Sequence, residues 1–304
     1  MVKRRIQVTG GSTYIVSLPK NWAKANGIEA GDEVDVIQEK DGIKIRFEEV
    51  KNKNKKTKIY VSERTKPNLI ERRVIGAYIA GYRTIEIEVA NRLPLRLRKL
   101  LWRIGKKLVG LELIEENINS IVFHDVLDIS ELSIIKALKR EYRIASSMHR
   151  DVNRVLKNFD EELAMDIVQR DDDVDRLYLV IFKQLVSANT NYHIAEKMGV
   201  LQNELLYYLI VAKNIERIAD RVVRIAENIV EEHCSAIESL CILSEESYEI
   251  HASAMNSFFS LDIEMADKTV EKAIEIRRKK REIYKEMENK TGTTGVVILD
   301  SIER

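Results

Sequence analysis

Residues 159–175 read FDEELAMDIVQRDDDVD and residues 261–277 read LDIEMADKTVEKAIEIR, and the two stretches align at a constant offset of 102 residues. This self-similarity predicts a duplicated helical unit. The first copy carries Asp171 and Asp175, which are four residues apart and therefore share one helix face. The second copy has Ala273 and Arg277 at the equivalent positions. Only the first copy is therefore expected to hold a cation with such a pair.

The second half of the chain has the pattern of a helical bundle. All three prolines lie before residue 95, and from residue 129 onward apolar residues recur at heptad-like spacing with few turn signals. An all-α bundle of about five long helices is predicted for residues 129–304, with repeat one at 129–231 and repeat two at 232–304. Breaks between helices are expected near residues 158–160, 189–199, 232–234, 260–262 and 289–295.

The first 47 residues have a different pattern. Short strands are predicted near residues 6–8, 14–18, 33–37 and 42–47, together with one short helix at 21–26. So few residues in small strands bury little apolar surface alone. This head domain, assigned to residues 1–50, is therefore expected to share its core with a second chain in a homodimer.

A third unit lies between the head and the bundle. Residues 51–58 read KNKNKKTK and are assigned to a linker because they are basic, polar and unpatterned. Residues 59–128 are predicted to form a small α/β domain. Its expected elements after a first strand are a helix at 67–81, a strand at 84–89, a helix at 95–109 and a hairpin of 111–115 with 120–124. The fold class is thus multidomain α+β.

Charge is unevenly distributed along the 304 residues, although the net charge is only +1. Residues 1–58 hold 13 basic and 8 acidic side chains, net +5, whereas residues 129–304 hold 25 and 32, net −7. The two ends are expected to prefer different partners. The longest strongly apolar stretch, residues 205–212, is far shorter than the roughly 20 residues of a membrane-spanning helix. A cytoplasmic protein without membrane insertion is expected.

The head carries the candidate DNA-binding residues. The only charged residues among the first 28 are basic, and an unneutralised basic patch, doubled by dimerisation, would attract the phosphate backbone of DNA. The alternative is that the head only dimerises and these side chains are simply solvated. The residues concerned are Lys3, Arg4, Arg5, Lys20 and Lys24.

The bundle carries the candidate metal ligands. Asp171 and Asp175 interrupt an apolar stripe, and carboxylates in a stripe that is buried need a counterion. The next helix repeats the arrangement with Glu216 and Asp220, again four residues apart. Oxygen ligands at this density suit Mg²⁺, Mn²⁺, iron or Zn²⁺. The alternative is that arginines pair with these acids at helical spacing, namely Arg217, Arg221 and Arg224.

Two family resemblances add to this interpretation. Residues 12–34, STYIVSLPKNWAKANGIEAGDEV, resemble the swapped-hairpin domain of the AbrB and SpoVT transcription factors. That resemblance covers residues 1–47 and implies an obligate intertwined dimer that binds DNA. The chain departs from the family at residues 9–13, TGGST, in the loop that contacts DNA in those regulators.

The bundle, in turn, resembles PhoU, the phosphate-uptake regulator. The resemblance is carried by DDDVDRLY at 171–178, NIERIADR at 214–221 and AENI at 226–229. It implies a fold of two three-helix bundles and a multinuclear iron or zinc cluster held here by Asp171, Asp175, Glu216 and Asp220. A swapped-hairpin head on a PhoU-like body is associated with archaeal phosphate regulators.

The second repeat departs from the PhoU pattern at its end. Residues 301–304, SIER, parallel NIER at 214–217 just where a third helix of the repeat is expected to begin. The second repeat is therefore interpreted as incomplete, and the native chain is expected to continue.

These observations and resemblances lead to a regulator of phosphate uptake or phosphate signalling. The head would bind DNA, and the bundle would be a metal-binding sensor or assembly domain. By analogy with PhoU, its partner would be the phosphate transporter's ATPase or a signalling protein. One alternative is a dimeric adaptor that does not touch DNA; another is a metal-dependent phosphohydrolase. An enzyme is not expected, because the sequence lacks a Gly-rich phosphate loop and its five histidines are scattered.

Overall fold

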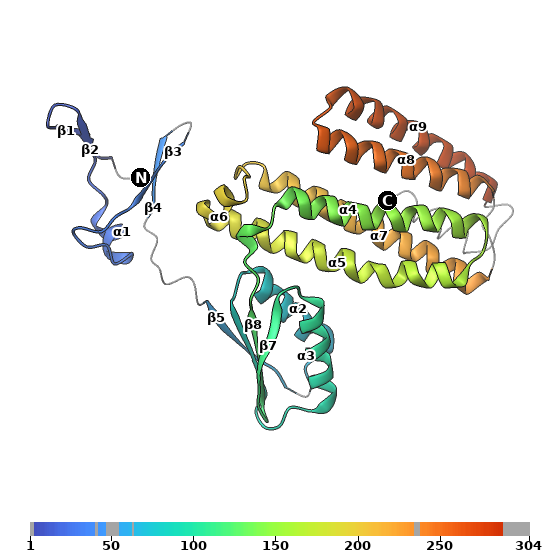
Figure 1. Ribbon diagram of the computed structural model, residues 1–304, viewed down its shortest axis with the longest axis horizontal. Coiled ribbons are helices and arrows are strands. Elements are labelled where there is room, and N and C mark those ends of the chain that lie inside the picture. The colour runs from blue at the N-terminus through green and yellow to red at the C-terminus, as the bar shows by residue number, and fades with distance from the viewer. Residues whose placement is uncertain (1–2, 40–41, 47–54, 63, 234–237, 288–304) are drawn as a thin grey trace. The chain divides into compact units, whose positions relative to one another are not determined.

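The computed structural model describes residues 3–39, 42–46, 55–62, 64–233 and 238–287 (Figure 1). The chain divides into two compact units, Met1–Lys55 and Lys56–Arg304. The first contains the head, and the second contains both the α/β domain and the helices.

The head consists of two antiparallel hairpins and one short helix. Strand β1 (Gln7–Thr9) pairs with β2 (Thr13–Ile15), and β3 (Asp35–Glu39) pairs with β4 (Gly42–Arg46). Between them lies α1 (Lys20–Ala25). Gly10 and Gly11 have φ angles of 58° and 80° in the β1–β2 turn, a conformation that glycine adopts without strain. The strands and the helix fall within a few residues of their predicted positions.

The described residues of a single copy of the head bury almost no apolar surface. Val8, Tyr14 and Val36 are 58%, 76% and 63% exposed, and α1 has no buried residue. Such side chains are typical of a core rather than of a surface, so one chain leaves the apolar faces of these hairpins uncovered.

The α/β domain is a four-stranded sheet with two helices. The sheet order is β5-β6-β8-β7; β5 and β6 are parallel and the other pairs are antiparallel. Both helices connect consecutive elements of the sheet, as in a βαβ unit. The elements are β5 (Lys56–Tyr60), α2 (Pro67–Ile79), β6 (Thr84–Glu88), α3 (Leu95–Lys107), β7 (Leu111–Glu116) and β8 (Ser120–Asp125).

Strand β5 corrects the predicted linker at residues 51–58, because the strand already begins at Lys56. Two lysines of the predicted linker, Lys56 and Lys58, lie on exposed positions of this edge strand. Lys58 is paired across the sheet with Glu86 and Glu88 at 3.0 and 2.8 Å. The alternate residue Ile59 is buried in the core. A polar run therefore forms a strand because its charges are matched by the neighbouring strand.

The helical part contains five long helices, as predicted, and one short one among the described residues. The breaks at 158–160 and 260–262 occur as expected, the break at 189–199 contains the short α6, and the break expected at 289–295 lies outside the described residues. The helices are α4 (Ile134–Lys157), α5 (Glu161–Thr190), α6 (Tyr192–Lys197), α7 (Leu205–Glu232), α8 (Glu238–Ser260) and α9 (Ile263–Met287).

The duplication is visible in the helix caps. The Asp160 carboxylate accepts a hydrogen bond from the Leu163 amide at 3.0 Å, and Asp262 does the same for Met265 at 2.9 Å. Both pairs are related by the offset of 102 residues. Helices α5 and α9 therefore begin in the same way, with an Asp N-cap. The third helix expected for the second repeat would follow residue 287, outside the described residues.

The two repeats also meet at equivalent positions. Helices α4 and α8 pack against each other, and the stacked rings of His149 and His251 lie 6.3 Å apart. The hydroxyls of Ser146 and Tyr248, also 102 residues apart, lie 3.4 Å from each other. The repeats are thus arranged about an approximate two-fold axis, like an isologous interface inside one chain.

A buried ion pair attaches the α/β domain to the helices. Lys183 of α5 donates a hydrogen bond to the Asp125 carboxylate at the end of β8, and the two side chains are only 2% and 3% exposed. The Lys183 ammonium also lies 4.1 Å from the centre of the Tyr78 ring, on α2. Burial lowers the pKa of Lys183.

Among the described residues, no helix is long and apolar enough to span a membrane.

Replacing Lys183 with Met should destabilise the protein strongly, since it leaves Asp125 buried without its cation. Removing one partner of a buried pair typically costs about 3–5 kcal/mol, and urea unfolding followed by circular dichroism would measure the loss. Adding Asp125→Asn should recover part of it. Lys58→Met, which removes a solvent-exposed ion pair, is the matched control and should have little effect. A loss for Lys183→Met no larger than the control's would contradict this assignment.

Candidate metal centre

The candidate ligands lie on two helices of the bundle that pack against each other, α5 and α7. On α5, Asp171 and Asp175 flank the buried Val174, and on α7, Glu216 and Asp220 flank the buried Ala219. The four-residue spacing brings each acidic pair onto one face. The apolar residues that surround them bring the two faces together.

Three of the four predicted ligands meet. Asp171, Asp175 and Asp220 each offer one carboxylate oxygen, and these oxygens all lie within 4.8 Å of one another. Asp171 and Asp175 are half-buried, whereas Asp220 is exposed at the edge of the cluster. We call these three residues the acidic cluster.

The carboxylates of the acidic cluster repel one another. Burial, followed by the charges of Asp175 and Asp220, raises the pKa of Asp171 to about 7. Burial and the charge of Asp175 also raise the pKa of Asp220. One oxygen of Asp171 is buried and has no hydrogen-bond partner. Carboxylates held this close together favour a bound cation.

The fourth predicted ligand, Glu216, lies beside the cluster and already has a partner. Its two carboxylate oxygens accept hydrogen bonds from the Lys213 ammonium at 2.5 and 2.6 Å. Burial raises the pKa of Glu216, although the hydrogen bond from Lys213 opposes this shift. Glu216 is therefore a neighbour of the three aspartates rather than a member of the same close group.

Glu141 on α4 is an acidic residue that the sequence analysis missed. Its side chain is fully buried, and neither carboxylate oxygen has a hydrogen-bond partner. Burial, followed by the charge of Glu216, raises its pKa to about 9, so the side chain is a neutral acid at pH 7. The available signal was its position among the buried residues Leu138 and Ala145, an apolar stripe interrupted in the same way as that of α5.

The cation that contacts the acidic cluster comes from the α/β domain. The Lys107 ammonium, at the end of α3, lies 2.8 Å from a carboxylate oxygen of Asp175. The described ion pairs thus join these acids to Lys107 and Lys213, while the charges of Arg221 and Arg217 oppose the rise in the pKa of Asp220. Neither lysine was predicted as a partner. The three arginines line a shallow pocket beside Asp220, namely Arg217, Arg221 and Arg224.

The candidate DNA-binding residues lie in the head, all of them on its surface. The first three, at positions 3–5, precede β1, and the last two lie four residues apart on one face of α1. Every one of these side chains is exposed: Lys3, Arg4, Arg5, Lys20 and Lys24.

Comparison with known families matches two parts of this architecture. Residues 138–229, from α4 through α7, match the model described as PhoU domain. This chain carries a PhoU domain. Residues 7–56 match the model described as antidote-toxin recognition MazE, bacterial antitoxin, in agreement with the swapped-hairpin resemblance. No curated protein and no solved structure matches the chain.

The PhoU domain includes all three helices that carry the acidic residues, and its side chains fit a metal ion. A cation held by the acidic cluster would satisfy the unpartnered oxygen of Asp171. Asp171, Asp175 and Asp220 would hold the ion. All three donors are hard carboxylate oxygens, which suit Mg²⁺, Mn²⁺ or iron. A bound metal would supply concentrated positive charge that ties α5 to α7.

Lys107→Met should increase the affinity of the PhoU domain for a divalent metal. The ammonium competes with any ion for Asp175, so its removal should tighten Mn²⁺ binding about tenfold, or about 1.4 kcal/mol. Isothermal titration calorimetry with Mn²⁺ would measure this change. Lys106→Met, which removes the adjacent exposed charge, is the control and should bind like the unmodified protein. Equal affinity in both variants would show that Lys107 and the metal do not compete.

Proposed function

We propose that this protein is a homodimeric, metal-binding regulator of phosphate uptake that binds DNA through its head. The observation that carries this proposal is the acidic cluster inside a PhoU domain, joined in one chain to a MazE-type head. The PhoU match supports a role in phosphate-uptake regulation, and a DNA-binding head would allow the protein to act on transcription.

In this proposal, the PhoU domain is the part of the protein that senses a signal or mediates assembly. Its carboxylates repel one another, so the packing of α5 against α7 depends on how much positive charge is present. A metal ion would provide that charge from solution, whereas Lys107 provides it from α3. By family analogy the metal is iron or zinc, and the all-oxygen donor set also suits Mg²⁺ or Mn²⁺.

In this proposal, the head forms the dimer. Its hairpins leave Val8, Tyr14 and Ile43 exposed, so the described residues of a single copy form no core. A second copy would cover these faces, as in the intertwined dimers of the swapped-hairpin family. Dimerisation would also bring two sets of the five basic side chains onto one particle.

Binding to DNA follows from the charge of that dimer. Lys3, Arg4 and Arg5 are exposed, and no acidic residue occurs among the first 28. Each chain would therefore contribute several phosphate contacts, with affinity that falls steeply as salt rises. By family analogy, the phosphate transporter's ATPase or a signalling protein would be the partner of the PhoU domain in the cytoplasm. The protein is proposed to be non-catalytic.

Asp175→Ala combined with Asp220→Ala should abolish stoichiometric metal binding without loss of helicity. The double substitution removes two of the three converging carboxylates, one from each helix. It reduces the repulsion between the carboxylates and leaves the apolar packing of the helices unchanged. Elemental analysis of the purified protein would measure the metal, and circular dichroism the helix content. The matched control is Asp172→Ala with Asp173→Ala, two exposed carboxylates on the same helix. An unmodified protein that binds no metal would refute the metal centre.

DNA binding should depend on the first three basic residues. Fluorescence anisotropy with fragments upstream of phosphate-transport genes, over a salt series, should show specific binding that Lys3/Arg4/Arg5→Ala weakens. The slope of log affinity against log salt should become shallower by about 0.9 for each DNA phosphate that the variant no longer neutralises.

The control for this experiment is Lys136/Arg140/Arg143→Ala, which removes the same charge from the exposed face of α4. It should bind DNA as the unmodified protein does. No binding above that of random DNA would instead assign the protein to the alternative class, a dimeric signalling adaptor.

A further inference from the structure

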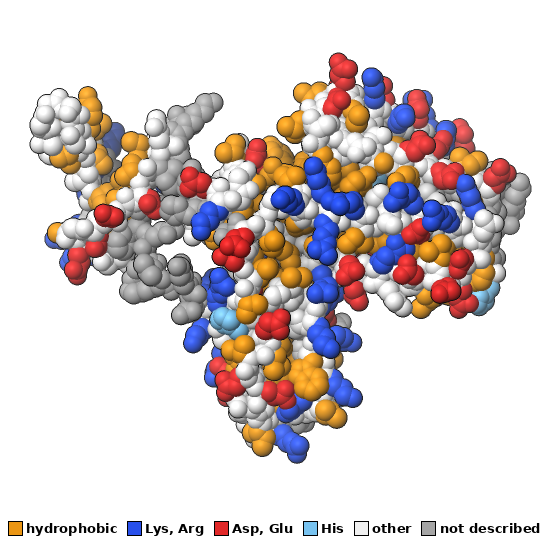
Figure 2. All heavy atoms as spheres, in the orientation of Figure 1, with side chains coloured by type: hydrophobic (Ala, Val, Ile, Leu, Met, Phe, Trp, Pro, Cys, Tyr) orange, Lys and Arg blue, Asp and Glu red, His pale blue; other side chains and the backbone are white. Residues whose placement is uncertain are grey.

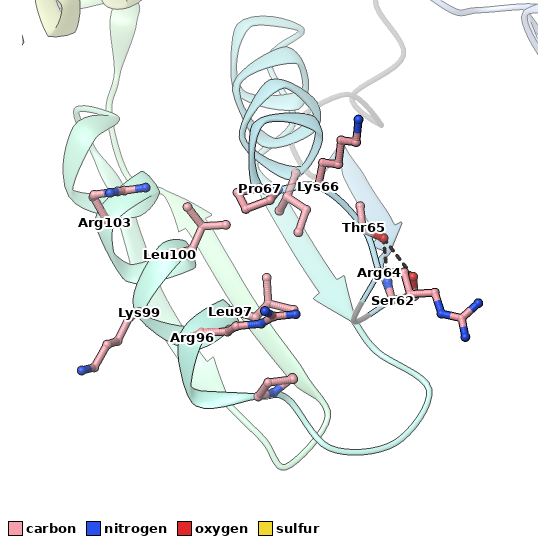
Figure 3. A pocket seen from close by; sticks show the side chains of 12 residues that line it. Ser62, Arg64, Thr65, Lys66, Pro67, Arg96, Leu97, Lys99, Leu100 and Arg103 are labelled. Carbon is pink, nitrogen blue, oxygen red and sulfur yellow. Dashed lines mark hydrogen bonds between the residues drawn. The ribbon is translucent and has the colours of Figure 1, made fainter.

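A groove of about 600 Å³ lies in the α/β domain, between the first turns of α2 and α3 (Figure 3). Its walls come from the segment that follows β5 and from the segment that follows β6, and these two strands are parallel neighbours. The groove therefore lies at the carboxyl ends of parallel strands, where open α/β sheets bind their ligands. Its volume falls within the range of small-molecule sites.

The lining of the groove is cationic at its rim. Among the described residues that line it, five are basic and none is acidic: Arg64, Lys66, Arg96, Lys99 and Arg103. Figure 3 shows Arg96 and Arg103 reaching from α3 toward α2, whereas Lys99 points away. In Figure 2, Lys and Arg side chains follow the edge of the domain where α3 lies. Such a rim attracts a ligand with several negative charges.

The floor of the groove is apolar. Ile70 on α2 and Leu97 and Leu100 on α3 line it and are buried beneath the basic rim. Inorganic phosphate would leave this surface uncovered, whereas a flat, mostly apolar ring system would cover it. Sites for such ligands combine an apolar lining with a few placed polar groups.

The two helices complete the electrostatics of the site. Neither α2 nor α3 has a capping side chain or an acidic residue in its first turn. Their N-terminal partial positive charges therefore add to the field of the basic rim instead of being neutralised within the protein.

We propose that this groove binds a nucleotide, with the base on the apolar floor and the phosphates at the basic rim. The site is separate from the acidic cluster and does not require a metal there. It would give the protein a second input, a phosphorylated small molecule, on the domain that also carries Lys107.

Isothermal titration calorimetry of the full chain with ATP, in EDTA and at low salt, tests this proposal. The unmodified protein should bind one ATP per chain. Lys66→Glu with Arg103→Glu, one rim residue from the N-cap of α2 and one from α3, should weaken binding at least about tenfold. The matched control is Arg72→Glu with Lys106→Glu, which makes the same charge change on exposed positions of the same helices outside the groove. This control should retain the affinity of the unmodified protein.

Further titrations separate the contributions of the base and of the phosphates to binding. Adenosine alone and pyrophosphate alone should each bind much more weakly than ATP. Adenosine would contact only the apolar floor, and pyrophosphate only the basic rim. Asp175→Ala with Asp220→Ala should bind ATP normally, which separates this site from the metal centre. The proposal is overturned if the unmodified protein does not bind ATP, if the groove variant binds as well as its control, or if pyrophosphate or adenosine binds as tightly as ATP.

Discussion

The buried ion pair between Lys183 and Asp125 is the constraint on which the second unit depends. Both charges are almost completely removed from water, and the cost of desolvation largely offsets their attraction. What the pair provides is a defined arrangement: Lys183 also lies over the Tyr78 ring, and Arg83 donates to the Asp125 carbonyl at 3.0 Å. These contacts fix the end of β8 and helix α2 against α5. The position of α3 then follows from the packing of the α/β domain.

The position of α3 connects two features that are far apart in the sequence. Its last residue, Lys107, contacts Asp175 of the acidic cluster, and its first turns, with Arg96, form one wall of the basic groove. A metal in the acidic cluster would compete with the Lys107 ammonium for Asp175, whereas the groove lies at the other end of the same helix.

Local signals in the sequence were sufficient for the helices and for the three aspartates of the acidic cluster. The Asp160 and Asp262 caps, the breaks between helices and the spacing of Asp171 and Asp175 all depend on residues close in the chain. The tertiary partners were not predictable in this way. Lys107 reaches Asp175 only because the α/β domain is attached to α5, and Glu141 meets Glu216 only through the packing of α4. Strand β5 was partly taken for a linker because the glutamates that match Lys58 lie on another strand.

The two repeats differ in the charged side chains that they carry. Helices α4 and α8 meet at equivalent positions, and His149 and His251 lie between them as neutral rings, because burial lowers their pKa values to about 3 and 4. That contact places no charge in the core, so the packing of the second repeat on the first requires no cation. In α9, Ala273 and Arg277 stand at the positions that the acidic pair occupies in α5. In the first repeat, Asp171 and Asp175 of α5 and Asp220 of α7 concentrate negative charge in one place, and Lys107 forms a described ion pair with Asp175.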